Sequence, residues 1–296
     1  MKLRLLRLED KSLFDRYLSK EPRSLASYAF ENIFLWKSLY EIFWVEISGA
    51  LCVFFQDKIG FFQFLPPIGQ DASKETIEKC FEIMNSHNNN STLSRIGNIE
   101  EKEADSYRRF GCKIAEGCCD YVCSRDELVS LGGVHYKNKR NAINSFKANY
   151  EFEYGPYVDA YRDESISLFK DWSRERKSKH NDSLYIKLLD DNFAVFKSAL
   201  IHFNKLNFIA RVVKIRNSIK AIALGYALGE NSFVVLFEVC DLSFSGIAQY
   251  IFQEICRGVQ CKDINIMDDS GLDSLKKVKL SYHPERIEKN FIASYE

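Results

Sequence analysis

Neither sign of charge dominates the sequence. Its 296 residues include 41 lysines and arginines and 41 aspartates and glutamates, so the formal net charge at pH 7 is zero. A net charge far from zero would attract a protein to nucleic acid or to an anionic membrane. Its absence excludes steering by the molecule as a whole, and a polyanionic partner would have to be bound by a local basic patch.

The sequence also lacks a long apolar run and the pattern of a secretory signal. No run is long enough to span a bilayer, and the chain starts with the charged segment Met1-Lys2-Leu3-Arg4. The nine cysteines are an odd number, which does not fit a complete disulfide framework. We therefore expect a reduced, cytoplasmic, monomeric protein without a transmembrane segment.

Cysteine pairs with the spacing of a metal site are missing as well. Cys112, Cys118, Cys119 and Cys123 lie close in sequence, but none belongs to a Cys-x-x-Cys pair and no histidine is suitably spaced. Free cysteine is usually buried. The pattern favours core positions, and we expect no metal ion.

The order of apolar patterns predicts the fold. The first half has an opening strand, two helical segments and three strands in close succession, and then alternates helices with strands. The second half repeats this order, with its three strands expected at 208–215, 221–227 and 233–240. We predict an α+β protein of two tandem domains like the N-acetyltransferase (GNAT) fold, each a mixed, mostly antiparallel sheet flanked by helices. The expected boundaries are 1–125, a connecting segment at 126–150 with a basic helix, and 151–296.

The most informative strand is Phe233–Cys240, a nearly continuous apolar run interrupted by Glu238. Such a run is typical of a strand buried on both faces. A carboxylate placed there is costly unless it is paired. Glu238 is therefore either a partnered structural charge or an acid or base in catalysis, and the sequence favours neither interpretation.

A polar turn and a helix follow this strand. Asp241 ends the strand, and Ser243-Phe244-Ser245-Gly246 leads into apolar residues at helical spacing. The N-terminus of a helix at the end of a strand is suited to binding a phosphate or an oxyanion. An ordinary helix cap explains the serines and the glycine equally simply.

The most basic stretch is a predicted helix at 136–150, which contains Lys137, Lys139, Arg140 and Lys147. Such a helix is suited to binding phosphates. A solvated helix face that joins two domains is the alternative.

A cluster of polar residues near the end of the sequence resembles the motif of a known family. The run 265–284, with Asp268-Asp269, Gly271, Lys276 and Ser281-Tyr282-His283-Pro284, resembles the terminal signature of the phosphatidylglycerol lysyltransferase C-terminal-domain family. That family is similar to the Fem-type aminoacyltransferases, which have two GNAT-like folds in tandem. The match extends through 139–146 to the segments 30–36 and 66–69, and so covers essentially the whole chain.

The resemblance implies an acyltransferase that moves an aminoacyl group from aminoacyl-tRNA to an amine or hydroxyl acceptor that the sequence does not identify. We expect Glu238 as the base, Asp241 to orient the acceptor or the turn, and Tyr282 as a proton donor to the leaving hydroxyl. The remaining expected binding residues hold phosphates, approach the substrates or form the wall of the site: Lys139, Arg140, Asn141, Gly246, Asn265, Asp268, Asp269, Lys276 and Lys279.

Two alternatives stay open. A coenzyme-A-dependent N-acetyltransferase would use acyl-CoA as donor, but it needs a phosphate-binding loop of several glycines directly after Cys240, and that loop has one glycine, Gly246. A catalytically degenerate GNAT-fold binding module is the other, because Val239 and Ile266-Met267 stand where the family commonly has polar residues. In both of the enzyme interpretations the functional pocket is expected in the carboxyl half.

Overall fold

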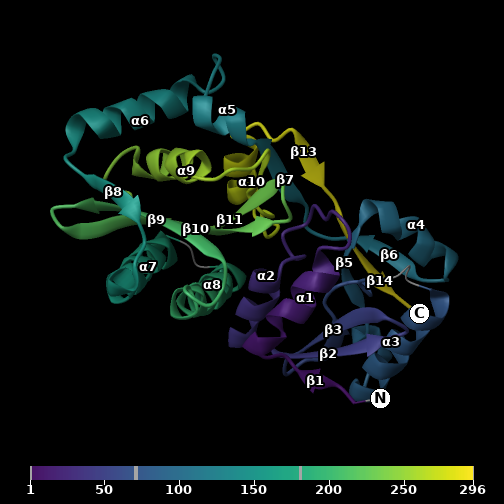
Figure 1. Cartoon of the computed structure of the whole chain (residues 1–296). Coiled ribbons are helices and arrows are strands. Elements are labelled where there is room, and N and C mark those ends of the chain that lie inside the picture. Colours follow the sequence, from purple (N-terminus) through teal and green to yellow (C-terminus); the bar gives the residue numbers. More distant parts are fainter. Residues whose placement is uncertain (1, 70–72, 180–181, 296) are drawn as a thin grey trace. The chain divides into compact units, whose positions relative to one another are not determined.

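The computed structural model describes residues 2–69, 73–179 and 182–295, which form two compact units (Figure 1). The first unit comprises Met1–Tyr121, Met267–Lys277 and Arg286–Glu296, and the second comprises Val122–Ile266 and Val278–Glu285. This division differs from the expected split at 125 and 150. The predicted connecting segment belongs to the second unit, and the end of the chain belongs to the first.

The first unit is built on a seven-stranded sheet with the order β1-β2-β3-β4-β5-β14-β6. Its neighbouring strands are antiparallel except for the parallel pair β4 and β5. The strands are β1 (Arg4–Leu5), β2 (Glu41–Ile47), β3 (Ala50–Gln56), β4 (Phe61–Gln63), β5 (Ile96–Glu100), β6 (Lys113–Glu116) and β14 (Asn290–Ser294). The α-helices are α1 (Lys11–Leu18), α2 (Phe30–Leu35), α3 (Lys74–His87) and α4 (Glu101–Arg109), and 3₁₀ turns lie at Leu8–Asp10, Trp36–Ser38 and Ser91–Leu93.

Strand β14 explains why the end of the chain returns to the first unit. It lies between β5 and β6 and pairs antiparallel with both, with Phe291 opposite Ile99 and Glu116. Phe291 and Ala293 are buried in the same core as Phe81 of α3 and Tyr107 of α4. The apolar alternation of β14 thus completes the core of the first unit.

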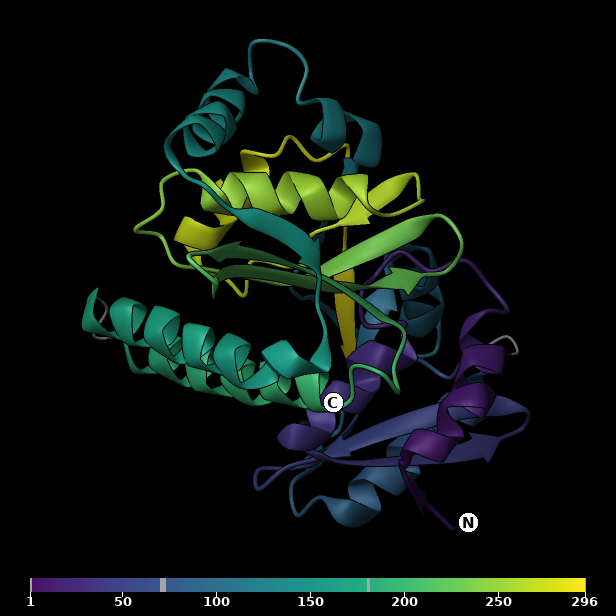
Figure 2. The same ribbon diagram turned by 60° about the vertical axis from the view of Figure 1, so that its left-hand side comes forward.

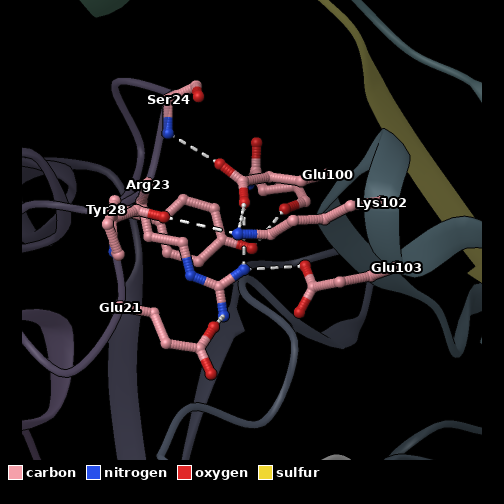
Figure 3. Close-up of polar contacts among 9 residues, drawn as sticks. Glu21, Arg23, Ser24, Tyr28, Glu100, Lys102 and Glu103 are labelled. Carbon is pink, nitrogen blue, oxygen red and sulfur yellow. Dashed lines mark hydrogen bonds and ion pairs between the residues drawn. The ribbon is translucent and has the colours of Figure 1, made fainter.

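A buried ion cluster fixes the segment before α2 in the first unit (Figure 3). Arg23, whose side chain is only 6% exposed, bonds to Glu100 at 3.1 Å and to Glu103 at 2.8 Å. Glu100 also accepts a hydrogen bond from the backbone N–H of Ser24 at 2.7 Å. Because Glu100 stands where β5 ends and α4 begins, the cluster ties the two parts of the chain together.

The second unit is built on a sheet with the order β13-β7-β12-β11-β10-β9-β8. In it β11 and β12 are parallel, while β7 with β12 and the pairs from β11 to β8 are antiparallel. The strands of this sheet are β7 (Asp120–Ser124), β8 (Glu153–Pro156), β9 (Phe208–Ile215), β10 (Ser218–Leu228), β11 (Ser232–Cys240), β12 (Asp263–Asn265) and β13 (Arg286–Glu288), of which β13 is made of residues assigned to the first unit. The helices are α5 (Arg125–Ser130), α6 (Lys137–Asn149), α7 (Arg162–Lys179), α8 (Ser183–Ile201), α9 (Ile247–Arg257) and α10 (Asp273–Leu280), with a 3₁₀ turn at Asp159–Tyr161.

Helices cover both faces of this second sheet. Helices α7 and α8 lie on one face and α9 on the other, with α6 packed beside α9 (Figure 2). Helix α9 turns Ile247, Ile251 and Ile255 into the core, which is the helical spacing seen in the sequence. Across the described residues, no helix is both long and apolar enough to cross a membrane.

Candidate functional site

Strands β11 and β12 of the second sheet pair with one another over a short length only. Their parallel pairing runs from Ser232 opposite Asp263 to Val234 opposite Asn265. Strand β11 then continues to Cys240, held on its other side by β10, where a bulge lies between Leu224 and Gly225. Glu238 lies on this continuation, opposite Ala223 of β10. The pairing of β11 with β12 thus ends at Val234, and Glu238 lies on the part of β11 beyond it.

Glu238 is partly buried and has an unusual electrostatic environment. Burial raises the pKa of its carboxyl group to about 7, although the nearby charges of Lys139, Lys279 and Arg176 lower it. Among the residues that the structure describes, no hydrogen bond or ion pair joins this carboxylate to another group. A carboxyl group that titrates near neutral pH can accept and return a proton, as a general base requires.

Lys139 comes from the first turns of α6 and lies against Tyr282. Its Nζ atom is 3.4 Å from the centroid of the Tyr282 ring and donates a hydrogen bond of 3.0 Å to Ser281 Oγ. Burial lowers the pKa of the Lys139 amine to about 8, and Glu238 partly offsets this by raising it. The charged amine of Lys139 thus makes a cation–π contact with Tyr282, a residue of the same unit.

Tyr282 is held on several sides. Its ring lies 4.5 Å from that of Phe252 on α9, and its backbone carbonyl accepts a hydrogen bond of 2.7 Å from the hydroxyl of Tyr136. Burial, and then the negative charge of Glu238, raise the pKa of the Tyr282 hydroxyl well above its ordinary value. The phenol therefore stays protonated at neutral pH, which the role of proton donor requires.

Asp241 and Gly246 have local structural partners. Asp241 accepts hydrogen bonds from Ser243 Oγ at 2.6 Å and pairs with Lys220 at 3.1 Å. Burial alone would raise the pKa of Asp241, but the hydrogen bonds from Ser243 and Lys220 lower it. Gly246 has φ of 87°, and a Cβ atom there would lie 2.1 Å from the carbonyl oxygen of Ala142 on α6. We expected the backbone of Gly246 to come close to a substrate. In the structure it comes close to the backbone of α6.

Arg140 and Asn141, which follow Lys139 on α6, differ in their contacts. Arg140 donates from Nη1 to the carbonyl oxygens of Leu131 and Gly133 and so closes the loop that precedes α6. Asn141 is exposed. The guanidinium of Arg140 is therefore committed to the backbone, whereas Lys137 and Lys147 are the exposed basic side chains of the helix.

The remaining residues expected at the site divide between the two units. Asn265 is buried on β12, and Lys279 donates to the carbonyl oxygen of Ile266, both in the second unit. Asp268 and Asp269 belong to the first unit and build a turn: Asp268 accepts from the N–H of Ser270, and Asp269 accepts from that of Gly271. Lys276 is exposed on the part of α10 that belongs to the first unit.

In the first sheet Asn98 lies just beyond the parallel pairing of β4 and β5. Strands β4 and β5 pair only at Gln63 and Ile96. Beyond this pair, Asn98 donates to the carbonyl oxygen of Phe64 at 2.8 Å, and its own side-chain oxygen accepts from Asn290 at 3.0 Å. The carbonyl oxygen of Asn98 accepts from the hydroxyl of Tyr28 at 2.7 Å. The polar groups of Asn98 are thus occupied within the first unit.

Sequence reasoning missed three residues that interact electrostatically with Glu238. The sequence around Arg176 is typical of a charged helix end, yet on α7 its charge acts on Glu238, and its guanidinium stacks over Trp172 at 3.9 Å. The spacing of four residues between Trp172 and Arg176 was an available signal. Cys240 and Cys256 are buried thiols on which the charge of Glu238 acts. Cys240 follows Glu238 by two residues and so lies on the same face of β11, whereas no pattern in the sequence brings Cys256 near.

Two mixed sheets in tandem, each containing a parallel pair among antiparallel strands, define a protein of the tandem GNAT-like class. The α+β fold expected from the sequence is confirmed. The family described as Phosphatidylglycerol lysyltransferase, C-terminal, matches residues 21–294. The chain belongs to this family, as its terminal motif indicated.

Solved structures share the fold. A conserved protein of unknown function from Bacteroides thetaiotaomicron is 22% identical with a TM-score of 0.89, and the match covers 100% of both chains. L-PGS from Bacillus licheniformis is 13% identical with a TM-score of 0.64, over 97% of this chain and 92% of that one. A tandem GNAT protein from the clavulanic acid biosynthesis pathway is 8% identical with a TM-score of 0.53, and the match covers 99% of this chain and 98% of that one.

A curated relative from Mycoplasmoides gallisepticum, itself uncharacterized, is 23% identical over 190 residues. The match covers 60% of this chain and 57% of that protein, so it spans little more than half of either sequence. Membership of the family supports a function of the acyltransferase type.

Proposed function

We propose that this protein is an aminoacyltransferase that moves an aminoacyl group from aminoacyl-tRNA to an amine or hydroxyl acceptor, beside the end of β11 that carries Glu238. The observation that carries the proposal is Glu238, a carboxylate with a pKa of about 7 and no ion-pair partner among the described residues. Tyr282, a protonated phenol in the same electrostatic cluster, supports it.

In the proposed reaction the acceptor attacks the carbonyl carbon of the aminoacyl ester. Glu238 takes the proton that the acceptor loses, and a tetrahedral oxyanion forms. When this intermediate collapses, the ester C–O bond breaks, and Tyr282 gives a proton to the departing hydroxyl of the tRNA. The protons then exchange with solvent, so that both groups return to their starting states.

Charge on α6 favours tRNA as the donor. The helix contains no acidic residue, and Lys137 and Lys147 are exposed on it. Coenzyme A is less well accommodated after β11, because the carbonyl oxygen of Ala142 lies against Gly246 at the start of α9. An oxygen at this position would repel a phosphate bound to the helix N-terminus.

The central experiment measures transfer from tRNA charged with radiolabelled amino acids to a panel of small amines, glycerol and vesicles that contain phosphatidylglycerol. Glu238→Gln should lower turnover by about 10²- to 10⁴-fold with unchanged tRNA binding, because the amide cannot take a proton. Glu153→Gln is the matched control, since Glu153 pairs with Lys214 at the surface. Undiminished turnover of Glu238→Gln would exclude it as the base.

Binding of the donor is tested separately by fluorescence anisotropy of labelled tRNA in a salt series. Lys137→Ala and Lys147→Ala should each weaken tRNA binding. Each should also reduce the slope of log K against log salt concentration by about 0.7 to 0.9 for the phosphate contact that it removes. Lys214→Ala, in the ion pair with Glu153, should leave both unchanged. A wild-type protein that binds neither tRNA nor acyl-CoA would favour a binding module over a transferase.

A further inference from the structure

Strand β1 forms one edge of the first sheet (Figure 1). Among the strands that the structure describes it pairs with β2 alone, with Arg4 opposite Trp44 and Leu5 opposite Phe43. The backbone N–H and C=O groups on its outer side are therefore not used in the sheet. An edge of this kind can accept a further strand from another chain.

A groove with a volume of about 360 Å³ lies beside this edge. It is lined by Leu3, Leu5, Trp44 and three basic residues, Lys2, Arg4 and Arg7. All three basic side chains are exposed, and within the described ranges none of them forms an ion pair.

Asp10 also lines the groove, but its carboxylate is already engaged. Its Oδ2 atom accepts hydrogen bonds from the backbone N–H of Arg7 at 2.8 Å and from Trp44 Nε1 at 3.1 Å. One anion against three cations leaves the groove with a net positive charge. Because the chain as a whole has no net charge, the attraction for anions is a local property of this groove.

The side chains of β1 alternate between the two faces of the sheet. The guanidinium carbon of Arg4 lies 4.9 Å from the centroid of the Trp44 ring, and Lys2 shares this face. Leu3 packs against the core of the first unit, and Leu5 shares its face but is 47% exposed. The edge thus presents cations on one face and a half-exposed leucine on the other.

We propose that the β1 edge is a docking surface for an extended acidic segment of a partner protein, which adds to the sheet as a strand beside β1. The side chains of such a segment alternate as well, so carboxylates at every second residue would meet Lys2 and Arg4. Apolar residues between them would cover Leu5. Backbone hydrogen bonds supply the affinity, and the charges select the partner.

Basic residues on a short edge strand also keep two copies of the same edge apart. That role explains the cations, but it explains neither the half-exposed leucine nor the groove beside them. An acidic strand is the partner whose charge turns the repulsion into attraction. The same cations therefore select against a second copy of this edge and in favour of the acidic partner.

The test measures binding of the full chain to a labelled peptide in which glutamate and valine alternate, by fluorescence anisotropy at low salt. The double variant Lys2→Glu with Arg4→Glu should weaken binding at least about tenfold, because each change turns an attraction into a repulsion. Lys58→Glu is the matched control, since it reverses an exposed charge of the same unit between β3 and β4, and it should leave the affinity unchanged. Equal affinities of the two variant proteins would overturn the proposal.

Changes in the peptide test strand addition without altering the protein. A peptide N-methylated at every amide keeps its charge but cannot pair with β1, and it should not bind measurably. Lysine in place of glutamate should abolish binding as well. If the N-methylated peptide, or an oligothymidylate of the same charge, bound as tightly as the unmodified peptide, the groove would attract any polyanion and strand addition would be refuted. Failure of the unmodified peptide to bind the wild-type protein at low salt would refute it equally.

Discussion

Replacement of Glu238 by glutamine is expected to stabilise the protein at pH 8 and to change its stability little at pH 5. Burial raises the pKa of Glu238 from 4.5 to about 7, against the charges of Lys139, Lys279 and Arg176. The folded state therefore binds the proton more tightly than the unfolded state does. The stability from this group is fully present below about pH 4.5 and is lost as the pH rises through about 7.

The size of the effect follows from the same shift. A difference of about 2.5 pKa units corresponds to about 3 kcal/mol when the carboxyl group is fully ionised. Solvent reaches part of the Glu238 side chain and screens its charge, so we expect a gain of about 2 kcal/mol for Glu238→Gln at pH 8.

Urea unfolding of the wild type and of Glu238→Gln at several pH values between 5 and 8 measures this gain as a difference in the free energy of unfolding. Glu153→Gln, a change of an exposed carboxylate, should show no such gain. A structural ion pair between Glu238 and Lys279 demands the opposite result. In that case Glu238→Gln would destabilise the protein by about 3 to 5 kcal/mol at pH 8. That result would refute the conclusion that the Glu238 carboxylate is unpaired.

Two further predictions concern the framework of each unit. Arg23→Met should lower the free energy of unfolding by about 3 kcal/mol, because it removes the buried cation of the cluster and leaves Glu100 with only the exposed Lys102 as ion-pair partner. Arg108→Ala removes an exposed pair with Asp105 and should change it by less than about 1 kcal/mol in the same urea assay. Gly246→Ala should destabilise the second unit in thermal unfolding by more than Gly271→Ala, since both glycines have positive φ but only at Gly246 would the new Cβ atom meet a backbone oxygen. Equal losses for the two glycines would show that the contact with α6 is unimportant.

The elements around Glu238 could be predicted from the sequence because their patterns are local. The apolar run of β11 and the helical spacing of α9 both appear in the structure at nearly the expected bounds. The order of elements predicted a helix after β12, and α10 is present there, but the basic run at 276–279 shows no apolar face because α10 buries none of its side chains. An amphipathic pattern is visible only where a helix packs one face.

The parts that could not be predicted depend on contacts between distant residues. The place of β14 between β5 and β6 joins residues far apart in sequence, and no local pattern specifies such a pairing. The directions of Lys139 and Arg140 are set by Tyr282 and by the carbonyl oxygens of the preceding loop. The sequence identified these cations as a motif but could not show that they point inward.

The two sheets differ at the ends of their parallel pairs, and this contrast bears on function. Asn98 lies on β5, the counterpart of β12, whereas Glu238 lies on β11, the counterpart of β4. In the first sheet Asn98 adopts a left-handed conformation, with φ of 52°, which asparagine tolerates, and its polar groups are hydrogen-bonded. In the second sheet Glu238 has no such partner among the described residues, and its ionisation costs about 2 kcal/mol. Stability alone would favour a paired or apolar residue on β11. A carboxylate retained there at a net cost is what an acid–base group requires, because a firm ion pair would lower its pKa below the range in which it can exchange protons at neutral pH.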